Sequence, residues 1–290
     1  MLAIKEITLD LRPRYRELTQ GNEVSYYSFT NLFMSRECTY YRYVEIEGGI
    51  CVLCLPPHKG PMCMFPLGVD NLGKAFEALR AEFPGLECIP MTRAMTERVE
   101  KECPGLMEFS EVRDSFDYVY ETEKMIRLQG KPYHSKRNFI SRFVSRYDYE
   151  YVPLDQSNVE ICLPMMEQWF AEHPGYISPM FNERQAMMEL IHNFDRLELK
   201  GAAIRVEGAV RAFSFGEYLQ PKMAHILIEK ADTTYPGLYP MINREFLEHA
   251  WADTEFVNRE EDMGLEGLRK AKLSYHPDHM NEIFVGKFMI

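Results

Sequence analysis

The sequence contains no apolar run long enough to span a membrane. No segment approaches the ~20 consecutive apolar residues of a membrane-spanning helix. The first residues, MLAIKEITLDLRPRYREL, carry charges every few positions and lack the apolar segment of a secretory signal peptide. The two absences predict a cytoplasmic protein without a transmembrane segment.

Motifs of several common enzyme classes are also absent. None of the eight histidines lies in an HxH or HExxH arrangement, and the sequence has no GxSxG motif and no Walker loop. These spacings bring together zinc ligands, a serine nucleophile or a phosphate-binding loop. The sequence therefore argues against a zinc protease, a serine hydrolase and a nucleotide kinase, and we expect no metal site.

The cysteines do not suggest a disulfide framework. Their number is odd, seven, and Cys51, Cys54, Cys63 and Cys162 lie in apolar stretches, which is typical of reduced core thiols. Cys51 and Cys54 form a CxxC. However, CVLC is rich in strand-forming residues, and residues three apart on a strand point to opposite faces.

The charge is acidic overall and basic in one segment. A net charge of −11 argues against DNA binding, because nonspecific affinity requires many phosphates to be neutralised at once. Between Lys124 and Tyr147 there are seven basic residues and no acid, whereas the rest of the chain has 33 − 7 = 26 basic against 44 acidic residues. Local positive charge favours an anionic ligand. A tRNA and an acidic lipid headgroup at the membrane surface are both open as partners.

Two predicted helices carry a lysine on an apolar face. In YHSKRNFISRFVSR, a projection at about 100° per residue places Lys136 at the centre of that face and Arg137 at its margin, whereas Asn138 points to the opposite, solvent side. In GLEGLRKAKLSY, the same projection places Lys272 and Arg269 on the apolar side. The apolar residues of the two faces are Phe139, Ile140, Phe143 and Val144 in the first and Leu265, Leu268, Ala271, Leu273 and Tyr275 in the second.

A buried ammonium group costs several kcal/mol unless an anion pairs with it. Such a cation therefore either extends to the edge of its helix or faces a polar cavity. We expect Lys136 and Lys272 to line one substrate cleft, with Arg137 or Arg269 nearby, and to bind a carboxylate or phosphate.

Periodicity and turn signals divide the chain into two α/β halves joined by the basic segment. We expect domains over residues 1–130 and 151–290, with a basic connecting helix over residues 131–150. The expected strands are 40–46, 50–55, 62–66, 86–89, 106–112, 116–120, 149–153, 199–206, 210–218, 223–230, 255–258 and 282–288. The expected helices are 71–82, capped by Asp70, and 92–103, 134–146, 159–171, 183–193, 240–251 and 264–275.

The second half has the element order of the GNAT acyltransferase core. In addition, the runs DYVYETEKMIRLQGKPYHSKRNFISRF and FVNREEDMGLEGLRKAKLSYHP resemble the soluble family related to the C-terminal domain of phosphatidylglycerol lysyltransferase. The resemblance covers nearly the whole chain. It implies an α/β fold of the α+β type with two tandem GNAT-like domains, each a mixed, mostly antiparallel sheet flanked by helices, and a substrate cleft between them. Membrane-bound relatives use aminoacyl-tRNA to aminoacylate lipid headgroups.

The loop TTYPGLYP corresponds to the loop that binds the CoA pyrophosphate in GNAT enzymes. That loop presents backbone N–H groups through several glycines. Here it has one glycine, Gly237, no leading Gln or Arg, and a proline that removes a donor. Gly237 is the candidate cofactor-binding residue, and shaping a turn is its alternative role. The loop argues against acyl-CoA, and no cofactor is expected to be required.

The segment from Arg259 to Asp262 follows a predicted strand at the point where a GNAT sheet opens. Arg259 and Asp262 are candidate substrate-binding residues, with capping of the next helix as the alternative role of Asp262. Glu260 is the candidate proton acceptor, and Tyr239 and Tyr275 are candidate general acids. Packing in the core is the alternative role of both tyrosines.

These observations lead to three functional hypotheses. The first is an aminoacyl- or acyltransferase that moves an acyl group, from aminoacyl-tRNA or another donor, to an amine or hydroxyl. The second is a noncatalytic module that binds a small anion, and the third is an acyl-CoA-dependent N-acetyltransferase. An acid or base group facing the same cavity as Lys136 and Lys272 would favour the first.

Overall fold

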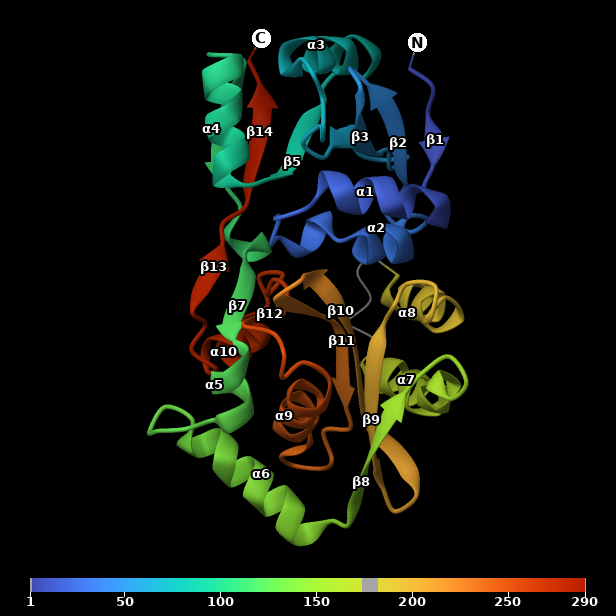
Figure 1. The fold of residues 1–290 in the computed structure, drawn as a ribbon, viewed down its shortest axis with the longest axis vertical. Helices are drawn as coiled ribbons and strands as arrows, with labels where there is room; N and C mark the ends of the chain where they lie inside the picture. Colours follow the sequence, from blue (N-terminus) through green and yellow to red (C-terminus); the bar gives the residue numbers. More distant parts are fainter. Residues whose placement is uncertain (1, 174–181, 290) are drawn as a thin grey trace. The chain divides into compact units, whose positions relative to one another are not determined.

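The computed structural model describes residues 2–173 and 182–289, which form two compact units (Figure 1). Unit 1 comprises Met1–Phe116 and Asn281–Ile290, and unit 2 comprises Asp117–Met280. In the described part of the chain, no helix is both long and apolar enough to cross a bilayer. All seven cysteines are free thiols.

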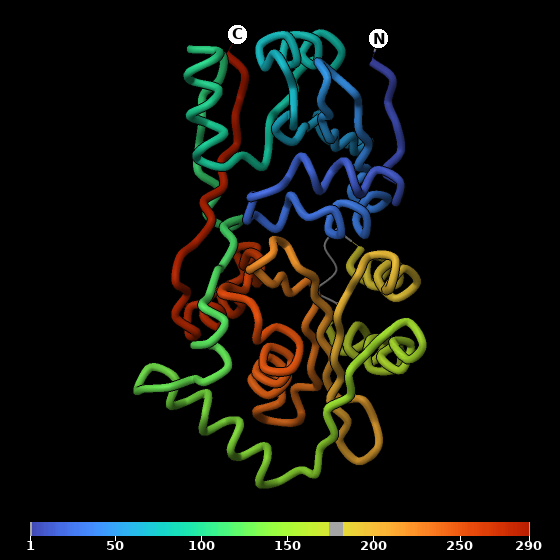
Figure 2. Tube along the Cα trace, viewed as in Figure 1, coloured from blue at the N-terminus to red at the C-terminus, as the bar shows by residue number. Residues whose placement is uncertain are grey.

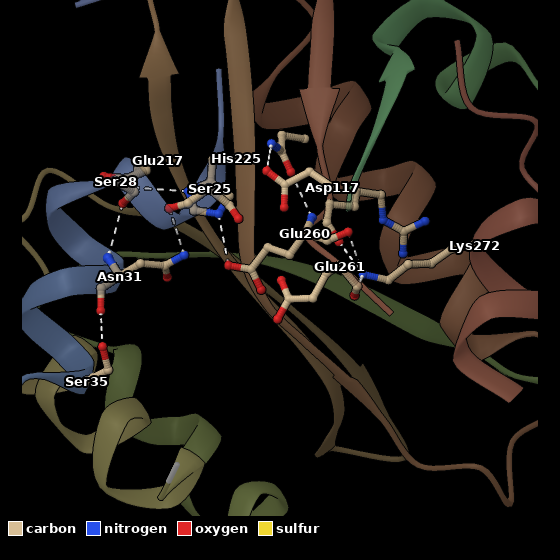
Figure 3. Close-up of polar contacts among 12 residues, drawn as sticks. Ser25, Ser28, Asn31, Ser35, Asp117, Glu217, His225, Glu260, Glu261 and Lys272 are labelled. Atoms are coloured by element: carbon tan, nitrogen blue, oxygen red, sulfur yellow. Dashed lines mark hydrogen bonds and ion pairs between the residues drawn. The ribbon is translucent and has the colours of Figure 1, made fainter. Parts of the chain in front are cut away.

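Unit 1 is built on a mixed sheet in the order β1-β2-β3-β4-β5-β14-β6. Its strands are β1 (Lys5–Glu6), β2 (Tyr41–Ile46), β3 (Gly49–Cys54), β4 (Met62–Cys63), β5 (Glu87–Met91), β6 (Met107–Glu111) and β14 (Phe284–Phe288). Its helices are α1 (Arg12–Leu18), α2 (Phe29–Ser35), α3 (Leu72–Glu82) and α4 (Arg93–Glu102), with 3-10 helices at Leu9–Leu11, Ser25–Tyr27 and Arg113–Ser115. Just before α2, the side chain of Ser28 accepts the Asn31 N–H and caps the helix (Figure 3).

Unit 2 is built on a second mixed sheet, in the order β13-β7-β12-β11-β10-β9-β8. Its strands are β7 (Asp117–Glu121), β8 (Tyr149–Leu154), β9 (Lys200–Val206), β10 (Ala209–Gln220), β11 (Met223–Ala231), β12 (Phe256–Asn258) and β13 (His279–Asn281). Its helices are α5 (Thr122–Arg127), α6 (His134–Arg146), α7 (Leu163–Glu172), α8 (Glu183–His192), α9 (Leu238–Ala250) and α10 (Glu266–Leu273), with a 3-10 helix at Val159–Cys162. The core of unit 2 forms where α9 and α6 cover one face of this sheet, through Ile140, Phe143 and Phe246. Figure 1 shows α7 and α8 on the other side of the sheet.

The two sheets share one plan. In each, three consecutive antiparallel pairs lead to a parallel pair, β4 with β5 in unit 1 and β11 with β12 in unit 2. The hairpin β2–β3 holds the same place in its order as β9–β10 does in the other. The expectation of two mixed sheets flanked by helices is confirmed, and the predicted correspondence of the two hairpins agrees with this order.

The units do not follow the boundaries expected from the sequence. Strand β7 lies in the expected first domain but pairs with β12 in unit 2. Strand β14 lies in the expected second domain but pairs with β5 and β6 in unit 1. Figure 2 shows this exchange as a green segment inside unit 2 and a red strand inside unit 1. Helix α6 is part of unit 2, where it packs on α9, and is not a connector. Strand pairing between distant segments decides these boundaries, and local sequence patterns do not reveal it.

Three helix details also differ from expectation. Helix α3 is capped by the side chain of Asn71, which accepts the Lys74 N–H, and not by Asp70. On α10 the expected apolar face is largely solvent-exposed, with Leu265 41% and Leu273 44% exposed, whereas Lys272 is 9% exposed. On α6, Ile140 and Phe143 are buried, but Phe139 and Val144 are exposed. The buried stripe of α6 therefore continues through Lys136 at helical spacing.

Candidate functional site

The candidate site forms where β11 and β12 diverge. The two parallel strands pair from Met223 with Phe256 to His225 with Asn258, and pairing then stops although β11 continues to Ala231. Side chains beyond the last pair therefore border a gap in the sheet. The prediction that the sheet opens at this point is consistent with the register.

A cavity of about 390 Å³ occupies this opening. It is lined by Lys136, Trp169, Glu183, Ile226, Leu227, Ile228, Glu229, Lys230, Tyr239, Pro240, Arg259, Glu260, Glu261, Met263, Leu268, Ala271, Lys272 and Tyr275. Both predicted lysines are among these residues, as are Arg259, Glu260, Tyr239 and Tyr275. Arg137, Asp262, Arg269 and Gly237 are not.

One wall of the cavity is cationic and aromatic. The Lys136 ammonium lies 4.0 Å from the centre of the Tyr275 ring, and the Arg259 guanidinium lies 5.2 Å from it. Arg259 donates to Glu229 at 2.9 Å, and Glu229 also accepts from Asn243 at 3.1 Å. No hydrogen-bond partner for Lys136 is found in the described part of the chain. Burial, together with the neighbouring Arg259, lowers the pKa of Lys136 to about 8.

Lys272 borders the cavity, but its ammonium points into the protein. Its Nζ donates to the main-chain carbonyls of Arg259, Glu260 and Glu261, at 2.5, 3.0 and 2.5 Å. Burial lowers its pKa, which the nearby Glu261 opposes. Lys272 therefore holds the turn after β12 through its ammonium group, and its predicted role in substrate binding stays a prediction.

Asp262 and Arg269 form a structural pair away from the cavity. The fully buried Asp262 carboxylate accepts two bonds from Arg269, both at 2.8 Å, one from the Tyr118 hydroxyl at 2.5 Å and one from the Gly264 N–H at 2.9 Å. Burial opposes ionisation, but the Arg269 and Tyr118 donors hold the pKa of Asp262 well below its usual range. Neither substrate binding nor helix capping fits this geometry, because α10 starts four residues later.

Glu260 is tied to a buried histidine. Its Oε1 lies 3.0 Å from Nε2 of His225 on β11, and Nδ1 of the same ring lies 3.2 Å from Glu217 on β10 (Figure 3). His225 is 0% exposed. Burial lowers its pKa, but the bonds to Glu217 and Glu260 outweigh burial and raise it to about 10. The imidazole is therefore a cation that donates to both carboxylates.

Glu261 is the acid of this turn to which no side chain of the described residues donates a hydrogen bond. The hydrogen-bond donor that acts on its carboxyl group is its own backbone N–H. Burial and the neighbouring carboxylates of Glu260 and Asp117 raise the pKa of Glu261 to about 8. Figure 3 shows its side chain beside that of Glu260, while Lys272 points to the carbonyls of the turn.

The far wall of the cavity holds a second charged group. Lys230, at the end of β11, lies 2.8 Å from Glu183 of α8 and 3.7 Å from the centre of the Trp169 ring. Together with the apolar side chains of Ile226, Ile228 and Leu268, these residues complete a pocket that is charged at several points and apolar between them.

Arg137 and Gly237 have structural roles in unit 2. Arg137 donates to the main-chain carbonyls of Leu128 and Gly130 and closes the loop before α6. Gly237 has φ +99°, and a Cβ on it would lie 2.3 Å from the Phe139 carbonyl oxygen. Close packing of α9 on α6 explains this glycine, in agreement with its alternative role as a turn residue.

The start of α9 offers few donors to a phosphate. The Leu238 N–H donates to the Tyr235 carbonyl, Pro240 has no N–H, and the Met241 N–H donates to the Gly237 carbonyl. A pyrophosphate cradle requires several N–H groups that point outward together.

Sequence reasoning missed His225, Glu217, Lys230, Glu183 and Trp169. A weak signal existed, because MAHILIEKA and AFSFGEYLQ each place an ionisable residue within an apolar strand. Metal-ligand spacings do not reveal a histidine such as His225, because its partners lie on other elements and have no fixed spacing from it in the sequence.

Comparisons with known proteins agree with this architecture. The family model described as phosphatidylglycerol lysyltransferase, C-terminal, matches residues 19–286. A conserved protein of unknown function from Bacteroides thetaiotaomicron VPI-5482 is 31% identical, with a TM-score of 0.91 over 100% of both chains. A curated protein of Mycoplasmoides gallisepticum, described as uncharacterized, is 26% identical over 179 residues, which are 60% of this chain and 56% of that protein. The chain thus spans little more than half of that relative.

Two more distant structures share the fold. The C-terminal domain of a putative lysylphosphatidylglycerol synthetase from Agrobacterium fabrum is 14% identical, with a TM-score of 0.68 over 96% of this chain and 90% of that one. A tandem GNAT protein from the clavulanic acid biosynthesis pathway is 10% identical, with a TM-score of 0.53 over 99% of this chain and 98% of that one. With its tandem GNAT-like fold and a family match over most of its length, the chain belongs to the family of phosphatidylglycerol lysyltransferase C-terminal domains.

Proposed function

We propose that the protein is an aminoacyltransferase that moves an aminoacyl group from an aminoacyl ester, such as aminoacyl-tRNA, to an amine or hydroxyl in the unit 2 cavity. One observation carries the proposal. The opening between β11 and β12 combines the ammonium of Lys136, which has no hydrogen-bond partner among the described residues, with the guanidinium of Arg259 and the carboxyl groups of Glu260 and Glu261. Acyl transfer requires positive charge near a developing oxyanion and a nearby acceptor for a proton.

The geometry suggests a role for each group. Lys136 and Arg259 stabilise the negative charge that develops on the ester carbonyl or hold a phosphate of the donor. The pKa of Tyr275 is raised by burial, so its hydroxyl stays protonated and is available as a general acid. Tyr239 lines the same cavity. Neither a covalent enzyme intermediate nor a cofactor is required in this scheme.

The reaction balances with these groups. The acceptor nitrogen or oxygen attacks the ester carbonyl, its new bond to carbon forms, and the ester C–O bond breaks. The proton of the nucleophile passes to Glu260, and the leaving oxygen takes a proton from Tyr239 or Tyr275. Exchange with solvent then restores both groups.

Donor preference follows from the loop before α9. Phe139 packs against Gly237, and the first turn of α9 has few outward N–H groups, which disfavours a CoA pyrophosphate. An aminoacyl ester needs no such cradle. Acyl-CoA-dependent acetylation is therefore the weaker alternative.

The proposal is tested with radiolabelled aminoacyl-tRNA prepared from total tRNA and all twenty amino acids. Full-length protein is incubated with this donor and with either polar-lipid vesicles or a mixture of soluble amines, and label is counted in the acceptor fraction. We expect transfer by wild type, at least about tenfold less with Lys136→Gln, and no change with Arg142→Gln, an exposed cation on the same helix.

A second function, binding without catalysis, has its own support. Oε1 of Glu260 already lies 3.0 Å from Nε2 of the buried His225, so this oxygen is engaged by another side chain. If no donor loses its label but anions stabilise the protein through Lys136, the protein is a noncatalytic anion-binding module and not an aminoacyltransferase.

A further inference from the structure

The turn after β12 uses nearly all its polar side chains to fix itself. Asn258 accepts the Glu260 N–H at 2.8 Å and donates to the buried Asp117 at 2.7 Å. Arg259 is held by Glu229, and Glu260 by His225. Asp262 is held by Tyr118 and Arg269. Glu260 even adopts a left-handed backbone conformation, with φ +58°, which a fixed turn can sustain.

Glu261 is the exception. The positive charge that acts on Glu261 is that of Lys272, but an ammonium has only three N–H donors. Lys272 directs its Nζ to the carbonyls of residues 259, 260 and 261, so its donors are spent on backbone oxygens. The rigid turn therefore presents to the cavity one carboxyl group that no side chain of the described residues neutralises.

We propose that Glu261 receives the ammonium group of a primary amine substrate at this end of the cavity. The inference rests on the proposed aminoacyl transfer, in which the α-ammonium of the donor's aminoacyl group, or an acceptor amine before it reacts, supplies that cation. Lys136 and Arg259 form the anion-binding wall of the same cavity. A substrate that joins an ammonium to an ester or phosphate would match both.

The surrounding charges support a cationic ligand. Glu260 on the same turn and Asp117 on β7 act on Glu261 with the same sign, and Lys272 on α10 acts with the opposite sign. The other charges that line the cavity are already paired, Glu229 with Arg259 and Glu183 with Lys230, or belong to Lys136. An ammonium group that enters the cavity would place a further positive charge beside Glu261.

Entry of the amine should also release a proton. Burial and the neighbouring carboxylates keep the Glu261 carboxyl largely protonated near neutral pH, since its pKa is raised to about 8. A cation beside it favours the ionised form. Binding of an amine that is itself already protonated therefore ionises Glu261 and releases one proton to solvent.

The experiment follows the side-chain carboxyl carbons of isotope-labelled glutamate in the full-length protein by NMR. The Glu261 signal is identified by its absence in Glu261→Gln, and propylamine is the probe, with propanol as its uncharged counterpart. We expect propylamine to move the Glu261 signal from the protonated to the ionised position at about pH 7, and propanol to leave it in place. We expect at least about tenfold weaker propylamine binding by Glu261→Gln, and no change in Glu266→Gln, an exposed acid on α10.

Each outcome is decisive. A Glu261 signal that is already ionised without propylamine, that ignores propylamine, or that responds equally to propanol overturns the inference. So does undiminished binding by Glu261→Gln. An amine-dependent response together with no aminoacyl transfer would reject the proposed function and leave the ammonium site intact. Aminoacyl transfer that is unaffected by Glu261→Gln would reject the ammonium site and leave the proposed function intact.

Discussion

The Glu260 carboxylate lies 3.0 Å from Nε2 of the fully buried His225. Because Glu217 holds the other ring nitrogen, the imidazolium is enclosed by two acids from different strands. His225 therefore connects Glu260, which lines the cavity, to the interior of the unit 2 sheet. A substitution of His225 should lower the stability of the protein and shift the position of Glu260.

His225→Asn should destabilise the protein by about 3 kcal/mol, because two buried carboxylates lose a charged partner. The pKa of His225 is raised from its ordinary 6.5 to about 10. The stabilising contribution is therefore complete below pH 6.5 and is lost as pH rises through about 10. Urea unfolding of wild type and His225→Asn at several pH values measures the difference in their free energies of unfolding. A difference in unfolding free energy that grows with pH would contradict the assignment.

Substitution should separate the two cavity lysines. Lys272→Gln leaves three main-chain carbonyls short of donors and should cost about 3 kcal/mol of unfolding free energy. Lys136→Gln removes a contact with the Tyr275 ring and should cost about 1 kcal/mol. Urea unfolding of the two variants measures the difference.

Thermal melts with inorganic pyrophosphate, a polyvalent anion, test whether Lys136 binds anions. We expect the anion to raise the melting temperature of wild type and of Arg142→Gln but not of Lys136→Gln. Equal stabilisation of all three proteins would remove Lys136 from the anion-binding wall.

Anion binding should weaken above neutral pH. The pKa of Lys136 is lowered to about 8, so the free protein loses this ammonium charge as pH rises through that value. Pyrophosphate affinity, measured by calorimetry, should fall across this range in wild type, whereas Lys136→Gln should bind pyrophosphate weakly at every pH. A parallel decline in both proteins would assign the effect to another group.

Gly237→Ala tests whether the loop before α9 is fixed by packing. Its Cβ would lie 2.3 Å from the Phe139 carbonyl oxygen at φ +99°, so we expect a loss of more than about 3 kcal/mol. Gly208→Ala is the matched control, because Gly208 has φ +79° but nothing within 4 Å of the added atom. Its cost should stay near about 1 kcal/mol. Similar costs for the two variants would mean that backbone conformation alone explains Gly237.

Acetyl-CoA should bind weakly or not at all. The Leu238 and Met241 N–H groups are already used, and Pro240 has none. Calorimetry with acetyl-CoA and with CoA provides the measurement. Micromolar affinity would restore the acetyltransferase alternative.

Much of the fold was accessible from the sequence, because its elements are marked by local signals. The α6 boundaries at His134 and Arg146 agree with the prediction, as does the hairpin around Gly48 and Gly49. Strand exchange was not predictable, since β14 looks like any apolar strand until its partners β5 and β6 are known.

The candidate site was predictable only in part. Lys272 was correctly expected at the cavity, but for a reason that does not apply, because Leu265 and Leu273 on the supposed core face are exposed. Its buried ammonium is stabilised by hydrogen bonds to main-chain carbonyls. Every residue has such a carbonyl, so no sequence pattern marks the ones that Lys272 contacts. Similarly, the contrast between the engaged Glu260 and the unengaged Glu261 depends on His225 and Lys272, which belong to other elements.

The exchange of β7 and β14 sets an order for folding during synthesis. Residues 117–280 are contiguous, so unit 2 has every strand that it needs before the end of the chain is made. Unit 1 is interrupted, and the place between β5 and β6 stays empty until residues 284–288 leave the ribosome. The part of the protein that is translated first is therefore the last to be completed. Until then, the edges of β5 and β6 are open to strands of other nascent chains.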